Sequence, residues 1–267
     1  MSDEGISLDE KRVYGEKTGT TELYVAAELG VAVVAVSADI VGEFSLAHRC
    51  AARDVAAGPE FLAVATDEDV LVSHEGSYAD TDFGPAVAVG FDKGDLLAAG
   101  PDGRVARRED QGWTELGTVA DVRAIDGGLL GAADGIYRVG DGLEHVGLSD
   151  VRDVATGGTP LAATGDGLYY LGPGWAKALD GAFTAAASAP DRGHAATADA
   201  LYEHTDDEWS EVDVPTDEPI AAVAHGPEAG AYAVTERGTV LVSVGDGWRD
   251  RALGLPGVSA VAVAPES

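Results

Sequence analysis

Short apolar runs of strand length, separated by turn residues, repeat along nearly the whole chain. One clear copy has runs at residues 151–156, 161–164 and 168–171 and ends at Trp175. Equivalent copies follow one another at intervals of about 30–39 residues. No segment has the 3.6-residue periodicity of a long amphipathic helix. The pattern therefore predicts an all-β protein built from internal repeats.

A tight turn joins the second and third runs of each copy. The turn is Gly-Asp-Gly at 165–167 in the copy above, and Asp-Gly stands at the same place at 102–103 and 134–135. Asp-Gly pairs favour the positive φ angles that a two-residue β-hairpin requires. We therefore expect consecutive runs to pair as antiparallel strands.

A large side chain occupies one fixed place near the end of each copy, and all four Trp residues of the chain fall there. Rings that recur at one repeat position indicate packing between neighbouring repeats more than they indicate a ligand platform. The residues at this place are Phe44, Tyr78, Trp113, Leu143, Trp175, Trp209 and Trp248.

Three or four short strands in each copy match a propeller blade of four antiparallel strands. A β-sandwich does not repeat its sequence at this period, and a β-helix repeats at a shorter one. The sequence therefore predicts a single seven-bladed β-propeller, with six continuous copies and one blade closed by N- and C-terminal strands. Runs at 21–27, 31–36 and 43–46 lack an innermost strand, which the C-terminal run 258–263 supplies. We place the propeller at 21–267 and an N-terminal tail or strap at 1–20.

The copy that contains Leu-Ala-Ala-Thr at 161–164, Gly-Leu-Tyr at 167–169 and then Trp175 resembles neuraminidase-type and regulator-type propeller repeats. The Ser-x-Asp-x-Gly-x-x-Trp pattern of such repeats is absent before the Trp residues, so a sialidase-like activity is not carried over. The whole chain, with its acidic composition, resembles a family of haloarchaeal β-propeller proteins. That resemblance implies the propeller fold and no particular activity.

The charge of the chain is strongly unbalanced. There are 47 Asp and Glu against 17 Lys and Arg, which gives a formal net charge of −30. Such a charge strains a compact fold at ordinary ionic strength, and molar salt, with a Debye length of about 3 Å, removes most of that strain. We expect a protein of a halophilic archaeon. Nucleic acid is excluded as an expected partner, because phosphate binding needs clustered Lys and Arg.

The chain contains no segment approaching the ~18 apolar residues that a transmembrane helix needs. Its first residues, Met-Ser-Asp-Glu-Gly, show no basic region followed by an apolar one. We therefore expect a cytoplasmic protein that does not bind membranes.

Sequence motifs of catalysis and of metal or cofactor binding are absent, including Gly-x-Ser-x-Gly, His-Glu-x-x-His, Cys-x-x-Cys and the phosphate-binding glycine loops. Cys50 is the single cysteine and stands among apolar residues, as a small core residue does. We predict no catalytic residue, no metal and no cofactor, and favour a protein that is not an enzyme.

One group of residues points to chemistry. When the innermost strands are aligned, Arg53, Arg123 and Arg152 fall in one column where each strand begins. The innermost strands of a propeller line its central channel, so these guanidinium groups are expected at one mouth of the channel. They would form an anion-binding pocket there. Alternatively, each Arg forms a salt bridge between blades with a carboxylate such as Asp54, Asp121 or Asp153, and this structural explanation is the one that we favour.

The function that the sequence favours is a non-catalytic scaffold that binds another protein across one face of the ring, because propellers present broad surfaces made of loops. The alternative is an enzyme or binder of a small anionic ligand at the mouth lined by Arg53, Arg123 and Arg152. An open mouth with unpaired Arg side chains would favour the ligand site, and a salt-bridged mouth would favour the scaffold. We expect the protein to be a monomer.

Overall fold

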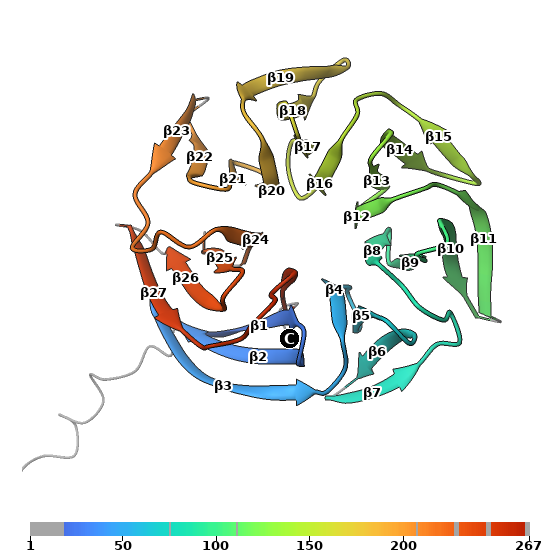
Figure 1. Ribbon diagram of the computed structural model, residues 1–267, viewed down its shortest axis with the longest axis horizontal. Coiled ribbons are helices and arrows are strands. Elements are labelled where there is room, and N and C mark those ends of the chain that lie inside the picture. The colour runs from blue at the N-terminus through green and yellow to red at the C-terminus, as the bar shows by residue number, and fades with distance from the viewer. Residues whose placement is uncertain are drawn as a thin grey trace, which may run out of the picture.

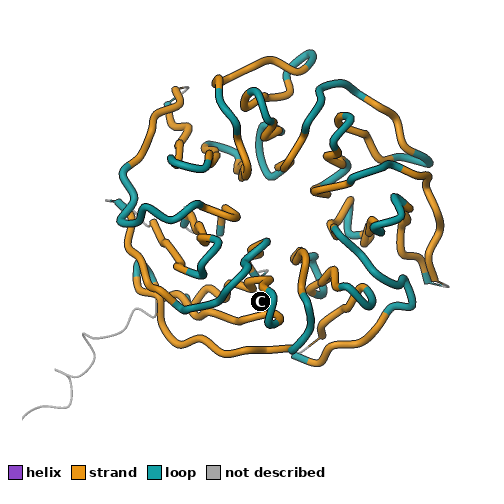
Figure 2. The backbone as a smooth tube through the Cα atoms, in the orientation of Figure 1, coloured by secondary structure: helices purple, strands orange, loops and turns teal. Residues whose placement is uncertain are grey.

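Seven four-stranded antiparallel sheets form a ring in the computed structural model (Figure 1). The structure describes residues 19–74, 76–110, 112–206, 208–226, 230–243 and 247–264. Strands and loops make up this part of the chain (Figure 2), and it contains no helix that could span a membrane. The all-β, seven-bladed propeller predicted from the repeat is confirmed. Most of the proposed N-terminal tail or strap, residues 1–18, lies outside the described residues.

Six blades are continuous in sequence, and each begins with its innermost strand. We number these blades 1 to 6 in chain order. Blade 1 contains β4 (Ala52–Ala57), β5 (Leu62–Thr66), β6 (Val70–His74) and β7 (Ser77–Asp80). Blade 2 contains β8 (Ala88–Asp92), β9 (Asp95–Ala99), β10 (Arg104–Glu109) and β11 (Gly112–Thr118). Blade 3 contains β12 (Val122–Asp126), β13 (Leu129–Ala132), β14 (Gly135–Val139) and β15 (Leu143–His145).

Blades 4 to 6 follow the same plan. Blade 4 contains β16 (Val151–Ala155), β17 (Leu161–Thr164), β18 (Gly167–Leu171) and β19 (Trp175–Asp180). Blade 5 contains β20 (Phe183–Ala189), β21 (Arg192–Thr197), β22 (Leu201–Thr205) and β23 (Glu208–Val212). Blade 6 contains β24 (Ile220–His225), β25 (Ala231–Thr235), β26 (Thr239–Ser243) and β27 (Trp248–Ala252).

The seventh sheet, which we call the composite blade, is built from both ends of the chain. Its strand order is β28 (Ala260–Val263), β1 (Thr20–Ala27), β2 (Gly30–Ser37) and β3 (Ile40–His48). The C-terminal β28 pairs antiparallel with β1, with Ala26 opposite Ala260 and Leu23 opposite Val263. Figure 1 shows the two ends of the ring, at opposite ends of the colour scale, side by side at this point. This confirms the predicted closure of the ring.

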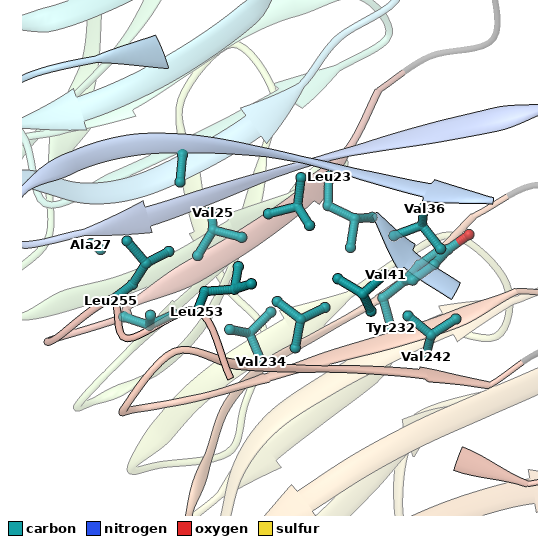
Figure 3. Packing of buried hydrophobic residues seen from close by; sticks show 14 residues of the cluster. Leu23, Val25, Ala27, Val36, Val41, Tyr232, Val234, Val242, Leu253 and Leu255 are labelled. Atoms are coloured by element: carbon teal, nitrogen blue, oxygen red, sulfur yellow. The ribbon is translucent and has the colours of Figure 1, made fainter. Parts of the chain in front are cut away.

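The hydrophobic core is divided among the seven joints between neighbouring blades, with one cluster of buried side chains in each joint. Figure 3 shows the joint where Leu23, Val25 and Val36 of the composite blade pack against Val234 and Val242 of blade 6. Each joint buries apolar faces of two sheets, so neighbouring blades stabilise each other.

The large side chains near the end of each repeat pack in these joints, as the sequence predicted, in six of seven cases. Those six residues are Tyr78, Trp113, Leu143, Trp175, Trp209 and Trp248. Phe44 differs, because it is 40% exposed and Val41 fills the joint in its place. The pairing of β2 with β3 contains two register shifts. Counting residues along the repeat therefore does not give the position that Phe44 occupies in the blade.

Candidate functional site

The innermost strands of the seven blades enclose a central channel with a cavity of about 430 Å³. All seven strands begin near the same mouth. Residues from every blade line the cavity. The side chains at these positions determine the chemistry of the cavity. The described residues that line it include Arg123, Arg152, Asp54, Asp126 and Asp153.

A β-bulge marks the start of the inner strands. In five blades the register shifts at the second residue of the inner strand, which is Arg53, Arg123, Arg152, Thr184 or Ala221. A β-bulge leaves its extra residue unpaired in the hydrogen-bond pattern of the two strands and changes the direction of that residue's side chain. The column that was aligned from sequence is therefore one structural position, at the mouth of the channel where the inner strands begin. We call it the arginine mouth, and the opposite end of the ring the far face.

Two of the three predicted Arg residues meet at the arginine mouth. Arg123 Nη1 donates to Asp150 Oδ1 at 2.7 Å and Arg123 Nη2 to Asp121 Oδ2 at 2.9 Å. Arg152 Nη2 donates to the other oxygen of Asp150 at 3.3 Å. The hydrogen bond from Arg123 holds the pKa of the Asp150 carboxyl below its usual range, with help from Arg152. The two guanidinium groups therefore share a carboxylate from within the chain.

The third predicted residue, Arg53, lies apart from this pair. It occupies the bulge of β4 and is exposed, but it is not among the residues that line the cavity. No ion pair joins Arg53 to another side chain in the part of the chain that the structure describes. The structure thus brings Arg123 and Arg152 together with Asp150 and leaves Arg53 outside the group.

Asp54 and Asp153 have a different role from the predicted salt bridges. Asp54 accepts hydrogen bonds from the backbone N–H of Val55 at 2.8 Å and of Val89, in the next blade, at 2.9 Å. Asp153 accepts from Val154 and from Ala186 of the next blade, both at 2.8 Å. Each carboxylate joins two blades at the wall of the channel.

Burial raises the pKa of both Asp54 and Asp153 to about 7, although the backbone hydrogen bonds act in the opposite direction. Each side chain keeps some exposed surface toward the cavity, yet the surrounding protein disfavours the charged form. Asp126 reaches the next blade in a related way, accepting from the N–H of Thr156 at 2.6 Å and from its hydroxyl at 3.0 Å, and burial raises its pKa as well.

Sequence reasoning missed this role, although a signal was present. Arg-Asp-Val-Ala occurs at 53–56 and again at 152–155, so the chain repeats an acidic residue directly after the bulge.

Within the described ranges, no three His, Cys, Asp or Glu side chains are grouped so that they could hold a metal ion.

A pair of imidazoles lies between blades 5 and 6. His194 Nδ1 and His225 Nε2 are 2.8 Å apart, and the ring of His194 is also in edge contact with Trp248. His194 is 2% exposed, and His225 lines the channel near the far face. Burial lowers the pKa of His194 to about 3 and that of His225 to about 4, so both rings are neutral at neutral pH.

The far face has a large open groove between blades 4 and 5, with a volume of about 970 Å³. Turns at the far ends of the strands form its walls. The ring of Tyr170, which is 41% exposed, stands on one side, and Trp209 and His204 stand on the other. Lys177 and Arg192 also line the groove. The groove therefore gathers aromatic side chains with two basic groups and two acidic ones, Asp191 and Asp206.

Solved structures similar to this chain are β-propellers or contain one. The structure of streptogramin B lyase matches with a TM-score of 0.68 and 11% identity, covering 93% of each chain. The extracellular domain of a putative one component system, BT4673 from B. thetaiotaomicron, matches with a TM-score of 0.65 and 12% identity over 86% of this chain. This chain spans 39% of the length of that protein.

A third structure, "YCF48 bound to D1 peptide", matches with a TM-score of 0.58 and 14% identity over 75% of this chain and 82% of that one. At such identities the likeness concerns the fold alone. No curated protein matches the chain in sequence. A family model described as "Beta-prop_HVO_0234:-like, beta propeller" matches residues 7–264.

Proposed function

The chain belongs to this β-propeller family, and from that premise we propose that it is a non-catalytic scaffold that binds another protein through the groove on its far face. We place it in the cytoplasm of a halophilic archaeon, and its charge of −30 supports the halophilic part of this setting. Fold alone does not choose a function for a propeller, so the proposal rests on one surface.

The observation that carries the proposal is the groove between blades 4 and 5. Tyr, Trp and Arg are the residues most enriched among those that dominate protein–protein binding energies, and Tyr170, Trp209 and Arg192 line this groove together. Tyr170 is also one of five large apolar side chains that are exposed in the described part of the chain. An extended segment of a partner would place its side chains between the two blades. The peptide complex of YCF48 is an example of a propeller that binds a peptide.

The arginine mouth supports the scaffold over the anion-binding alternative. A free anion would compete there with Asp150, which already bonds both Arg123 and Arg152. A free anion must first displace this carboxylate, so it gains less binding energy than it would gain from two guanidinium groups without a partner.

Affinity capture from a native lysate in molar salt tests the proposal. The wild-type protein, Tyr170→Ala and Leu29→Ala are used as baits. Leu29 is a matched control, because it is 52% exposed and lies in the turn between β1 and β2, on the side of the arginine mouth. A captured protein is then purified, and its affinity for each bait is measured by calorimetry in the same salt.

We expect Tyr170→Ala to weaken binding by about tenfold or more and Leu29→Ala to leave it unchanged. Equal affinity of wild type and Tyr170→Ala for the captured protein would overturn the assignment of this groove. The absence of any captured protein would count against the scaffold itself.

A further inference from the structure

The outermost strand of the composite blade exposes apolar side chains. Of the five large apolar residues exposed in the described part of the chain, three lie on β3: Ile40, Phe44 and Leu46. With 9 residues, β3 is longer than any other outermost strand that the structure describes; β11, with 7, is the next. Propellers and other β-proteins ordinarily protect sheet edges with short strands and charged side chains. β3 is long and carries one acidic side chain, Glu43.

The middle of β3 is open to pairing. β3 ends its sheet, so its outer side has no strand partner among the described residues. Arg251 of blade 6 bonds the carbonyl oxygens of Val41 and Gly42, which leaves residues 43–47 uncovered by that side chain. Phe44 and Leu46 lie opposite Val34 and Ala32 of β2. They therefore project from the same side of the sheet as those two residues.

The charges around β3 are nearly balanced, unlike those of the molecule as a whole. Glu43 is the one acidic residue of the strand. Asp39, in the turn before β3, forms an ion pair with Arg249, and the Arg251 guanidinium lies 5.8 Å from the centre of the Phe44 ring. Two copies of a protein with charge −30 repel each other, so they approach most easily where the surface is apolar and locally neutral.

We propose that two copies of this chain associate through β3, with the two strands antiparallel about Ser45. In this register Phe44 of each copy lies opposite Leu46 of the other, and Glu43 lies opposite Ala47, so no like charges face each other. Aromatic–aliphatic pairs across an antiparallel ladder are favourable. The dimer joins two sheets into one and covers both exposed edges. It is independent of the groove proposed to bind a partner, and it replaces the monomer expected from sequence.

The salt dependence distinguishes a second copy from a heterologous occupant. A basic partner would be attracted by the charge of −30, and salt would weaken its binding. Two identical copies repel each other through that charge, so salt that screens the repulsion strengthens their association. An apolar contact at β3 is therefore expected to form in molar salt and to dissociate as the salt is removed.

Light scattering coupled to size-exclusion chromatography tests the proposal on the full chain in molar KCl. The wild type, Leu46→Glu and Phe44→Glu are compared with Leu29→Glu, which introduces the same charge at another exposed leucine of the same blade. Circular dichroism shows that each variant is folded. We expect the wild type and Leu29→Glu to have twice the mass of one 27.2 kDa chain and the two β3 variants to have that of one.

Several outcomes would overturn the proposal. A wild-type protein that stays monomeric in molar KCl at high micromolar concentration does not use β3 to self-associate. If the β3 amides that point away from β2 are then still protected from hydrogen exchange, another occupant covers the edge, such as residues 1–18 of the same chain. A dimer that survives both Leu46→Glu and Phe44→Glu uses another surface, and a dimer that dissociates as salt is raised is held by opposite charges.

Discussion

Asp54 and Asp153 occupy the same position in blades 1 and 4, directly after the bulge residue of the inner strand, and each carboxylate bonds its own blade to the next. The two bonds to each residue come from equivalent backbone N–H groups. A buried carboxylate without such donors would be costly. With these donors, the carboxyl group joins neighbouring blades at the channel wall. Its burial also makes it difficult to ionise.

The pH dependence of stability is the first prediction. The pKa of Asp54 in the folded protein, about 7, lies above the ordinary value of 3.8. The folded state therefore holds a proton that the unfolded state releases between these values, and stability from this group falls as pH rises from about 4 to about 7. We expect Asp54→Ala to destabilise the protein more at about pH 5 than at about pH 8, by at least ~1 kcal/mol.

Urea denaturation of the wild type and of Asp54→Ala at the two pH values measures this difference. Asp199→Ala is the control, since Asp199 is an exposed carboxylate in the turn between β21 and β22. A destabilisation by Asp54→Ala that is the same at both pH values would contradict the assignment. Asp153→Ala should behave like Asp54→Ala, because its carboxylate has the same two kinds of donor and the same raised pKa.

The histidine pair predicts the opposite trend on the acid side. At 2.8 Å, one ring nitrogen of His194 and His225 must donate and the other must accept, so the two rings cannot both be protonated. Their folded pKa values of about 3 and about 4 lie below the ordinary 6.5. The unfolded state takes up protons first, and the stability that comes from these two groups is lost as pH falls from about 6.5 toward about 4.

Replacing one ring tests the pair. His225→Gln removes one of the two titrating imidazoles and leaves Asp54 and Asp153 in place, so we expect the urea midpoint of the variant to rise relative to that of the wild type as pH falls from about 7 to about 5. His74→Gln, at an exposed histidine of β6, should differ from the wild type by the same amount at both pH values. If the difference in urea midpoint between His225→Gln and the wild type is the same at both pH values, the imidazole pair does not control acid stability.

The repeat made most of the fold predictable. Apolar runs, Asp-Gly turns and the spacing of the four Trp residues are local properties of the sequence. They were sufficient to predict the number of blades and the closure of the ring. The composite blade was less predictable at β3, where register shifts break the count that assigned Phe44. A bulge adds a residue without changing the apolar pattern, so counting along the chain does not reveal it.

The candidate site was only partly predictable, for a different reason. Aligning the inner strands found the position of Arg123 and Arg152, but their shared partner Asp150 belongs to the turn before β16, with a left-handed φ of 46°. Asp54 likewise bonds an N–H that lies 35 residues away along the chain. Such contacts follow from how adjacent blades stack, which the sequence of one repeat does not encode.

Removal of Asp150 tests whether the arginine mouth has a latent affinity for anions. In Asp150→Ala, Arg123 and Arg152 lose their common partner, and we expect sulfate to bind more tightly than to the wild type by about tenfold. The double variant Asp150→Ala/Arg152→Ala should lose that gain. Calorimetric titration with sulfate at constant ionic strength measures all three proteins. Sulfate binding by the wild type that Arg152→Ala weakens would instead support the anion-binding alternative.

Dependence on salt is the prediction that concerns the whole molecule. The charge of −30 is spread over a ring, and at about 10 mM salt the Debye length of ~30 Å lets carboxylates on different blades repel each other. We expect circular dichroism and Trp fluorescence to show loss of structure at that salt and native signals in molar KCl. The fluorescence is a direct probe of the blade joints, because Trp113, Trp175, Trp209 and Trp248 all pack there.

Sucrose separates screening from general stabilisation, since it strengthens burial without shielding charge. If repulsion unfolds the ring, KCl restores the native signals and sucrose at matched osmolality restores much less. Equal recovery in the two solutions would indicate that the apolar joints are simply weak. Unchanged spectra at about 10 mM KCl would mean that the seven joints hold the ring closed against its own charge.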